Sequence, residues 1–349
     1  MRGRGEARQQ ASTRPPKPSW DDLDELGEHA QLCATRLEHL VEVREPIVLI
    51  SQIQRSGGTL LSQLFDGHPE CHAHPGELHI GHPQKWDWPP LDLERPEQWF
   101  ELLFEKPAYK ALRDGYRKPS SPDIEHDVFP FLFSPRLQKA IFERCSAQWP
   151  IERERDVLDC YFTSYFNAWL DNHNLYATPK RIVTGFAARL SSELENVERF
   201  FAAYADGLLV SVVRDPCAWY ASARRHRTHY HDLDTAMGLW HHATAAAIAA
   251  RERWPEHVVL LTYEDLVQET ERTMRRVADK AGISMSPVLL TPTFNGRPIR
   301  ANSSIPVDRY GVIADRAQSG RAELDDGTIS RIQSALGDLY EQGAGLARG

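Results

Sequence analysis

Apolar and polar positions along this chain predict short buried strands that alternate with amphipathic helices. Four apolar stretches have the length and continuity of strands buried on both faces, at residues 47–50, 181–186, 207–213 and 258–262. Apolar residues at helical spacing lie around them, at residues 60–65, 135–148, 155–171, 192–206, 219–227, 234–253, 270–281 and 329–340. This alternation predicts an α/β fold of three layers, α/β/α, with a central parallel sheet.

The domain organisation is expected to be simple. Residues 1–18, rich in arginine and proline, read as a disordered basic tail, with a basic recruitment arm as the alternative. An amphipathic helix is expected at residues 21–43. Since no repeat or linker is visible, we expect one domain over residues 19–349. Residues 83–130 form an irregular insertion with a short helix near Glu97–Phe104, either a substrate wall or a surface excursion.

Composition narrows the possible partners. The 349 residues are 41% hydrophobic and 26% charged, which is ordinary for a globular protein, and the net charge of −8 gives no support for nucleic-acid or anionic-membrane binding. No apolar run is long enough to span a membrane, and the N-terminus lacks the apolar core of a signal peptide. Five scattered cysteines without a CxxC pair indicate no disulfide frame or zinc site, so we expect a cytoplasmic protein.

The first strand is followed by a polar turn, Gln54–Thr59, and then by a helix. Backbone N–H groups at a helix start lack internal partners and carry partial positive charge, so such a turn suits an anion. Gly57 and Gly58 let the backbone approach a phosphate closely. The turn is no Walker A loop, because no lysine precedes Thr59. The alternative is an ordinary strand–helix turn whose glycines serve packing alone.

Polar residues suited to anions also follow two later strands. Arg214 ends the strand at 207–213, and Tyr263 ends the strand at 258–262. Ligands of parallel sheets bind beyond the carboxyl ends of the strands, so these residues and Arg55 are expected along one edge. Two separated basic sites with an aromatic residue between them suit a nucleotide that carries phosphate at both ends of its ribose.

The segment from Gly67 to His82 is expected to be a loop, and it contains five histidines. We predict no metal site there, because no clean pair spacing with a distant partner pair is present. Glu77 follows Pro75 and Gly76, where a carboxylate could reach over a bound anion as a general base. The alternative is a solvated loop acid. His79 and His74 are the next candidates for a base.

Taken together, these motifs resemble the sulfotransferases that use 3′-phosphoadenosine 5′-phosphosulfate. The family's loop of the form (Lys/Arg)-Ser-Gly-(Thr/Gly)-Thr matches Arg55–Thr59. Its arginine at a strand end, with a serine eight residues later, matches Arg214 and Ser222. Its YEDL segment matches Tyr263–Leu266, and LFDGHPECHAHPGE is similar to a stretch of protein-tyrosine sulfotransferases that ends in the glutamate base, here Glu77 with one residue inserted.

The resemblance implies the sulfotransferase variant of the P-loop fold and a nucleotide donor that needs no metal. It assigns the donor's 5′ side to the turn and the helix start, namely Arg55, Ser56, Gly57, Gly58, Thr59 and Leu60. Arg214 and Ser222 would bind the 3′-phosphate, with Tyr263 near the adenine. The family's usual lysine is replaced in TGFAARL, where Arg189 is the nearest cation. The usual covering loop is not obvious, and NGRPIRANSS could serve instead through Arg300, Asn302 and Ser303.

The implied reaction moves a sulfuryl group to a hydroxyl or amine of a small molecule, glycan or peptide. Glu77 would take the acceptor's proton, and Arg55 would stabilise charge on the leaving phosphate. Two alternatives stay open. A nucleotide-dependent kinase predicts a Walker A lysine and a magnesium-binding acid, and a non-catalytic nucleotide- or glycan-binding protein predicts binding without transfer. The acceptor and the oligomeric state cannot be inferred from the sequence.

Overall fold

The structure is a computed structural model that describes residues 25–80, 87–105, 115–117, 128–225, 227–300, 309–314 and 320–349. Its contacts divide the chain into two units, residues 1–39 and 40–349. In the first unit, helix α1 spans Glu25–Glu38, so the predicted helix at 21–43 is confirmed over these residues. It ends earlier than predicted. In the second unit, the backbone N–H groups of Val41 and Val43 donate to side chains of a later helix instead.

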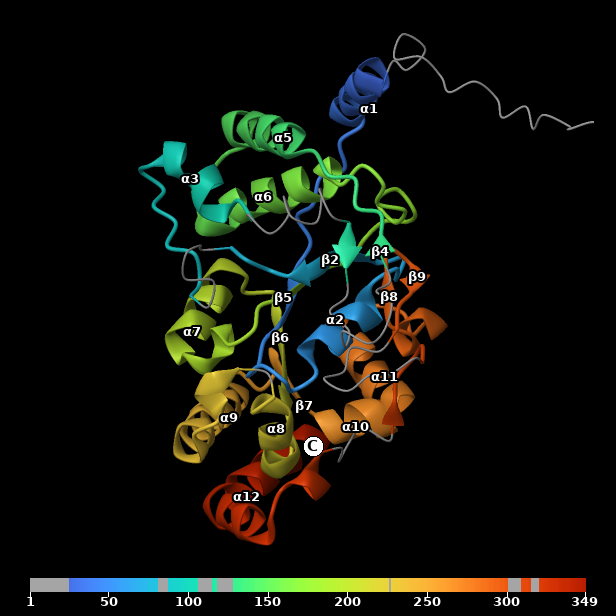
Figure 1. Cartoon of the computed structure of the whole chain (residues 1–349). Helices are drawn as coiled ribbons and strands as arrows, with labels where there is room; N and C mark the ends of the chain where they lie inside the picture. The colour runs from blue at the N-terminus through green and yellow to red at the C-terminus, as the bar shows by residue number, and fades with distance from the viewer. Residues whose placement is uncertain are drawn as a thin grey trace, which may run out of the picture. The chain divides into compact units, whose positions relative to one another are not determined.

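A parallel sheet of five strands forms the centre of the second unit (Figure 1). Its order is β2-β5-β1-β6-β7, with β2 at Cys71–Glu77, β5 at Ile182–Phe186, β1 at Ile47–Ile50, β6 at Leu208–Val213 and β7 at Val258–Thr262. The chain runs from β1 to the edge strand β2, returns to β5 between them, and then crosses to β6 on the other side of β1. The carboxyl ends of β1 and β6 are therefore neighbours at the point where the strand order reverses, which favours a ligand site there.

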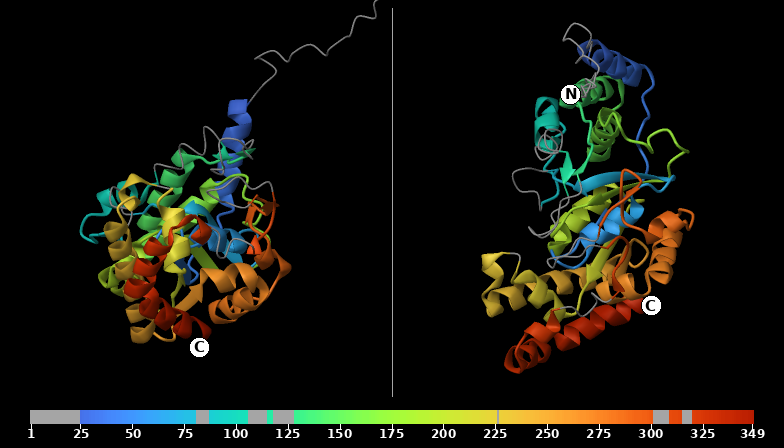
Figure 2. Two further views of the ribbon diagram at one scale, coloured as in Figure 1. Left: turned by 60° about the horizontal axis from the view of Figure 1, so that its bottom comes forward. Right: turned by 45° about the vertical axis from the view of Figure 1, so that its right-hand side comes forward.

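Helices cover both faces of this sheet, as Figures 1 and 2 show. Because strand side chains alternate between faces, Val259 and Leu261 belong to a different apolar cluster from Leu260. The first cluster includes residues of α2 (Gly58–Phe65), α10 (Tyr263–Gln268) and α11 (Thr270–Ala281). The opposite clusters include residues of α8 (Pro216–Ala223), α9 (Leu233–Arg253) and α12 (Asp326–Arg348). The predicted three-layer architecture is thus confirmed.

Two further helices, α5 (Pro135–Gln148) and α6 (Glu154–Ala168), lie beside the β2 edge. The aromatic residues of α6 are buried. The Phe166 ring lies 5.0 Å from the His72 ring, and the Tyr165 ring lies 4.7 Å from the His74 ring. Helix α6 therefore covers the histidine side chains that β2 presents to it.

The strand β2 corrects the prediction that residues 67–82 form a loop. Its sequence, CHAHPGE, lacks apolar periodicity, but the His72 and His74 side chains are nearly fully buried. Proline is tolerated here because β2 is an edge strand, and the pairing register with β5 shifts between Ala73 and Glu77. Polar side chains buried at an edge thus concealed the strand.

The remaining elements are short or peripheral. The described part of the 83–130 insertion contains α3 (Pro96–Leu103) and a hairpin of β3 (Tyr116–Arg117) with β4 (Val128–Phe129). Helix α7 spans Leu194–Ala203, and a second hairpin joins β8 (Thr293–Phe294) to β9 (Arg297–Pro298). The predicted basic tail lies outside the described residues. None of the helices that the structure describes is both long and apolar enough to cross a membrane.

Candidate functional site

The turn after β1 is tight and includes two residues in the left-handed region. Arg55 has φ 71° and Gly57 has φ 94°, both in the left-handed region. Such a conformation costs a non-glycine residue on the order of 1 kcal/mol or more, so Arg55 is held there by its surroundings. Helix α2 then starts at Gly58, and no side chain caps it. The Ser56 hydroxyl is buried and has no hydrogen-bond partner among the described residues.

Both glycines of this turn are required by space as well. A Cβ atom at Gly57 would lie 2.7 Å from Cδ2 of Tyr263, and one at Gly58 would lie 1.8 Å from Nε2 of Gln52 and 2.4 Å from the Phe186 ring. The two glycines therefore serve close packing, whether or not the turn also binds an anion. This role is compatible with an anion site, because the same close packing brings the ends of β5 and β7 to the turn.

Residues from three strand ends meet at this turn. Arg55 Nε donates to the Ser222 hydroxyl over 3.1 Å, although 167 residues separate them. Arg214 Nη1 donates to the Arg55 carbonyl oxygen over 2.7 Å, and the Arg214 guanidinium lies 4.2 Å from the centre of the Tyr263 ring. We call Arg55, Arg214, Ser222 and Tyr263 the arginine cluster. It differs from the expected pair of separated basic sites, since its members touch one another.

The arginine cluster places positive charge in a buried setting. Burial, and then the nearby Arg214 charge, lower the pKa of Arg55. Burial also lowers the pKa of Arg214, which is only 6% exposed and whose Nε has no hydrogen-bond partner among the described residues. A buried donor without a partner costs about 1–3 kcal/mol. An anion that bound to these groups would remove that cost. The cluster therefore favours an anionic ligand.

Glu77 is the last residue of β2 and pairs with Phe186 of β5. The Leu78 N–H donates to the Phe186 carbonyl oxygen over 2.7 Å, which holds the chain beside β5 after the strand has ended. Since the Phe186 ring also touches Gly58, one residue joins the Glu77 segment to the turn after β1. Glu77 thus lies at the same sheet edge as the arginine cluster.

The histidines of this region have separate structural partners. His68 Nε2 lies 3.0 Å from the Ser284 carbonyl oxygen, and His74 Nε2 lies 2.9 Å from Glu105 Oε1. His79 donates its backbone N–H to Glu105 Oε2 over 2.9 Å. Among the described residues, no group of His, Cys, Asp and Glu side chains is arranged to hold a metal ion. His82 lies outside the described residues.

Three residues were assigned by resemblance to the far side of the nucleotide. Arg300 follows β9 and pairs with Tyr310 in an antiparallel bridge, with its guanidinium 5.7 Å from the Tyr310 ring. Asn302 and Ser303 lie outside the described residues. The hairpin before Arg300 is attached to the carboxyl end of α2, where Asp66 accepts hydrogen bonds from the N–H groups of Asn295 and Gly296 at 3.0 and 2.9 Å.

Sequence reasoning missed several residues that support the turn. The Tyr230 hydroxyl donates to Gln54 Oε1 over 2.9 Å, and Arg189 donates to that same hydroxyl. The Arg189 backbone N–H also donates to the Gln52 carbonyl oxygen over 3.0 Å. The absence of the family's usual lysine from TGFAARL was the sequence signal for this group. It indicated Arg189, which thus lies beside the turn.

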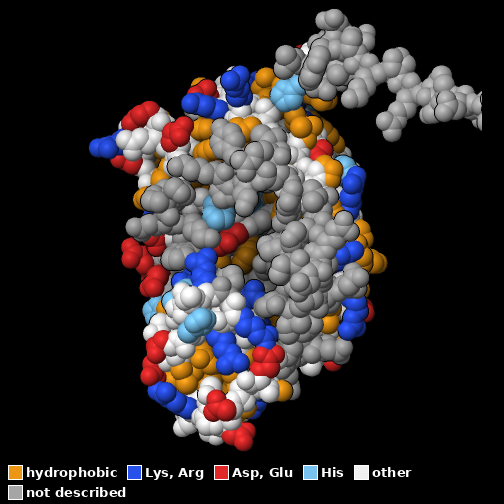
Figure 3. All heavy atoms as spheres, in the orientation of Figure 1, with side chains coloured by type: hydrophobic (Ala, Val, Ile, Leu, Met, Phe, Trp, Pro, Cys, Tyr) orange, Lys and Arg blue, Asp and Glu red, His pale blue; other side chains and the backbone are white. Residues whose placement is uncertain are grey.

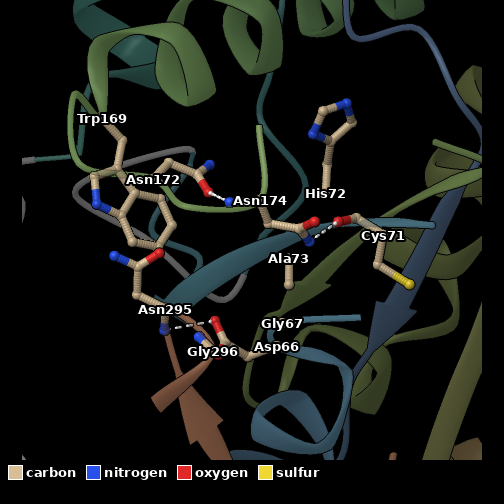
Figure 4. A pocket seen from close by; sticks show the side chains of 10 residues that line it. All are labelled: Asp66, Gly67, Cys71, His72, Ala73, Trp169, Asn172, Asn174, Asn295 and Gly296. Atoms are coloured by element: carbon tan, nitrogen blue, oxygen red, sulfur yellow. Dashed lines mark hydrogen bonds between the residues drawn. The ribbon is translucent and has the colours of Figure 1, made fainter. Parts of the chain in front are cut away.

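A different pocket lies at the opposite edge of the sheet, at the amino end of β2 (Figure 4). It is lined by Asp66, His72, Trp169, Asn174 and Asn295, together with neighbouring backbone. Figure 4 shows the Asn295 backbone N–H bonded to the Asp66 carboxylate, and the Asn174 side chain directed at the Cys71 carbonyl group. These polar groups are used to hold segments together. None of the predicted site residues lines this pocket.

Figure 3 shows one face of the molecule. Lys and Arg side chains gather below a hollow, acidic side chains lie above it, and histidine side chains occur on both sides.

Comparison with known proteins identifies the class of protein that this fold and site define. The chain belongs to the sulfotransferase family, whose family model matches residues 46–287. That range includes the turn after β1, the arginine cluster and Glu77. No curated protein sequence gives a significant match.

Solved structures of similar fold are bacterial sulfotransferases. The sulfotransferase domain of the Synechococcus PCC 7002 olefin synthase has a TM-score of 0.51 and 17% identity, over 84% of this chain and 95% of that chain. The sulfotransferase domain of the curacin biosynthetic pathway has a TM-score of 0.47 and 17% identity, over 84% of this chain and 98% of that one. At such identities, the likeness to the olefin synthase domain supports the fold alone.

Proposed function

We propose that this protein transfers a sulfuryl group from 3′-phosphoadenosine 5′-phosphosulfate to a hydroxyl or amine of a small molecule, glycan or peptide. The observation that carries the proposal is the arginine cluster. Residues predicted for the two ends of one nucleotide, Arg55 and the Arg214–Ser222 pair, are in contact at the start of α2. One ligand with several phosphate oxygens could therefore reach all of them.

The residues present fit such a donor. The uncapped N–H groups at the start of α2 and the buried Ser56 hydroxyl would bind oxygens on its 5′ side. Arg214 and Ser222 would bind the 3′-phosphate, where the unpartnered Nε of Arg214 offers a further donor. The Tyr263 ring, stacked on Arg214, would border the adenine. Arg300, Asn302 and Ser303 stay candidates for the cover over the 3′ side.

When bound, the donor supplies an activated sulfuryl group whose departure leaves charge on the 5′-phosphate. Arg55 and the N–H groups of the turn would stabilise that charge, as in other transfers that depend on positioning and electrostatics. Glu77 would accept the proton of the attacking hydroxyl or amine. His74 is the weaker candidate, because both its ring nitrogens face acceptors, Glu105 Oε1 at 2.9 Å and the Gly76 carbonyl oxygen at 3.2 Å. His79 stays the second candidate.

The proposal is tested in two steps. Calorimetry with adenosine 3′,5′-bisphosphate should show binding that Arg214→Ala weakens about tenfold or more, since a buried charged contact is lost. A radiolabelled donor should then transfer its label to one member of a panel of phenols, alcohols, sugars and tyrosine peptides. Glu77→Gln should lower kcat about 100-fold or more while binding of the bisphosphate is kept.

The alternatives predict other results. Turnover of ATP that depends on magnesium would favour a kinase. Tight binding of the bisphosphate without transfer to any acceptor would favour a non-catalytic nucleotide-binding protein. A wild-type protein that does not bind the bisphosphate would contradict the proposal altogether. Near-normal turnover of Glu77→Gln would remove Glu77 from the role of base.

A further inference from the structure

A buried carboxylate lies against the segment that carries Glu77. Glu105 follows α3 and is only 4% exposed. Its Oε1 faces His74 Nε2 at 2.9 Å and accepts from the Tyr161 hydroxyl, and its Oε2 accepts from the His79 backbone N–H at 2.9 Å. Glu105 thus binds two groups from the segment 74–79 and one from α6. It does not belong to the arginine cluster and matches none of the family motifs.

The hydrogen bonds of His74 favour its charged form. Nε2 faces a carboxylate oxygen, and Nδ1 faces the Gly76 carbonyl oxygen at 3.2 Å. Because an ionised carboxylate and a carbonyl oxygen only accept hydrogen bonds, this arrangement favours a proton on both nitrogens. Burial by itself would lower the pKa of His74, but Glu105 and the Gly76 carbonyl outweigh burial and raise it. In turn, burial would raise the pKa of Glu105, and His74, Tyr161 and the His79 N–H together lower it.

These hydrogen bonds hold the backbone on both sides of Glu77. The Gly76 carbonyl, directly before Glu77, is held by His74. The His79 N–H, two residues after it, is held by Glu105, and the Leu78 N–H between them is held by Phe186. The pairing register shifts within this stretch, as in bulges that redirect a side chain near an active site. Without its fixed neighbours, a Pro-Gly stretch at a sheet edge would have few restraints.

We propose that Glu105 is a positioning residue which, through His74 and the His79 N–H, fixes the backbone around Glu77 and so holds its carboxylate at the acceptor. The inference rests on the proposed function for its catalytic consequence, but its structural part can be measured without any substrate. The physical reason is that a general base must lie within about 3 Å of the proton it takes, and a displacement of about 1 Å can cost 100-fold in rate.

The structural test compares two buried carboxylates. Glu105→Met has similar length and no acceptor, so it should release the Glu77 segment. Asp159→Leu is the matched control, because Asp159 is also a buried carboxylate that binds a tyrosine: it lies on α6 and accepts from the Tyr204 hydroxyl at 3.0 Å. Hydrogen exchange should show the amides of residues 77–80 opening about tenfold faster or more in Glu105→Met, and unchanged in Asp159→Leu. Equal exchange in Glu105→Met and wild type would overturn the inference.

The kinetic test asks whether Glu105 acts through Glu77. Glu105→Met should lower kcat about tenfold or more, while the affinity for adenosine 3′,5′-bisphosphate stays within about twofold. Glu105→Gln, which keeps one acceptor, should recover part of the loss. In a Glu77→Gln background, Glu105→Met should have little further effect, because the group it positions is gone. The same factor lost in both backgrounds would show a merely structural role.

A second variant covers the case in which Glu105→Met does not fold. Tyr161→Phe keeps the ring and removes one donor to Glu105, so exchange at residues 77–80 should rise by a smaller factor. Unchanged exchange in a folded Tyr161→Phe would then count against the inference. The two proposals fail separately. A wild-type protein without transfer defeats the proposed function, whereas an active wild type with a normal rate in Glu105→Met defeats the positioning role.

Discussion

Each half of β2 contains a buried histidine, and the pKa values of the two histidines are shifted in opposite directions. His72, in the amino half, packs against Phe166, and its Nε2 has no hydrogen-bond partner among the described residues. Burial, and then the charge of Lys180, lower the pKa of His72 to about 3, so it is neutral. His74, in the carboxyl half, is equally buried, but its pKa is raised because Glu105 faces it. The group that faces each histidine, and not the residue type, therefore decides the direction of its pKa shift.

The two halves of β2 also lie beside different features of the molecule. The amino half borders the pocket of Figure 4, where Asp66, Asn174 and Asn295 hold loops together. The carboxyl half ends in Glu77 at the edge that holds the arginine cluster. If this comparison is sound, the two histidines should respond differently to the same replacement.

The largest expected effect is on stability. His74→Phe removes one partner of a buried ion pair and should lower the free energy of unfolding by about 3 kcal/mol or more. His72→Phe removes a neutral ring with an apolar neighbour, so it should change that free energy by less than about 1 kcal/mol. Urea denaturation of both variants measures the difference. An equal loss of unfolding free energy in His72→Phe and His74→Phe would show that the two histidines do not differ as described.

A smaller effect on the free energy of unfolding is expected when the pH is lowered. The unfolded chain protonates His72 near its ordinary pKa of 6.5, whereas the folded chain does so only near pH 3. Between these values the unfolded state binds more protons, so His72 should reduce stability by up to about 1.4 kcal/mol for each pH unit of acidification. His74 affects stability in the opposite direction. Its raised pKa stabilises the folded state at low pH, and this contribution is lost as pH rises through the pKa of His74 in the folded protein.

The His72→Phe variant isolates this pH effect. Its stability, measured by urea denaturation from pH 7 to pH 4, should fall less steeply than that of the wild type. Parallel curves for the two proteins would show that His72 takes up protons while folded, contrary to its buried setting.

The smallest expected effect is on donor affinity. Both histidine variants should bind adenosine 3′,5′-bisphosphate within about twofold of the wild type, because neither residue belongs to the arginine cluster. Arg214→Ala, measured alongside by calorimetry, shows how much affinity is lost when a residue of the arginine cluster is removed. If His72→Phe weakened binding as much as Arg214→Ala, the two edges of the sheet would not be independent.

The sequence allowed the sheet to be predicted where its strands are continuous apolar runs. Ile47–Ile50 and Val258–Thr262 were placed with the correct ends. It did not reveal β2, because buried polar histidines break the apolar pattern that identifies a strand. Helix α10 was also missed, since its six residues are too few for a periodic signal, although Thr262 caps it by accepting the Asp265 N–H at 3.0 Å.

The candidate site was predictable only in part. The residues of the arginine cluster are recognisable from motifs that precede or follow strands, and parallel strands bring such positions to one edge. That Arg55 and Ser222 touch could not be inferred, because their contact depends on the left-handed backbone of Arg55. Glu105 had no signal at all. It lies in an irregular insertion, and its pairing with His74 exists only after the chain has folded.

The bare start of α2 has a consequence for protein engineering. A serine or aspartate cap at Gly57 would ordinarily add about 1 kcal/mol to a helix. Here the left-handed backbone and the Tyr263 ring exclude it, and a cap would occupy the N–H groups that we assign to the donor. Efforts to make this protein more heat-resistant should therefore leave α2 unmodified and seek their gains in helices remote from the turn.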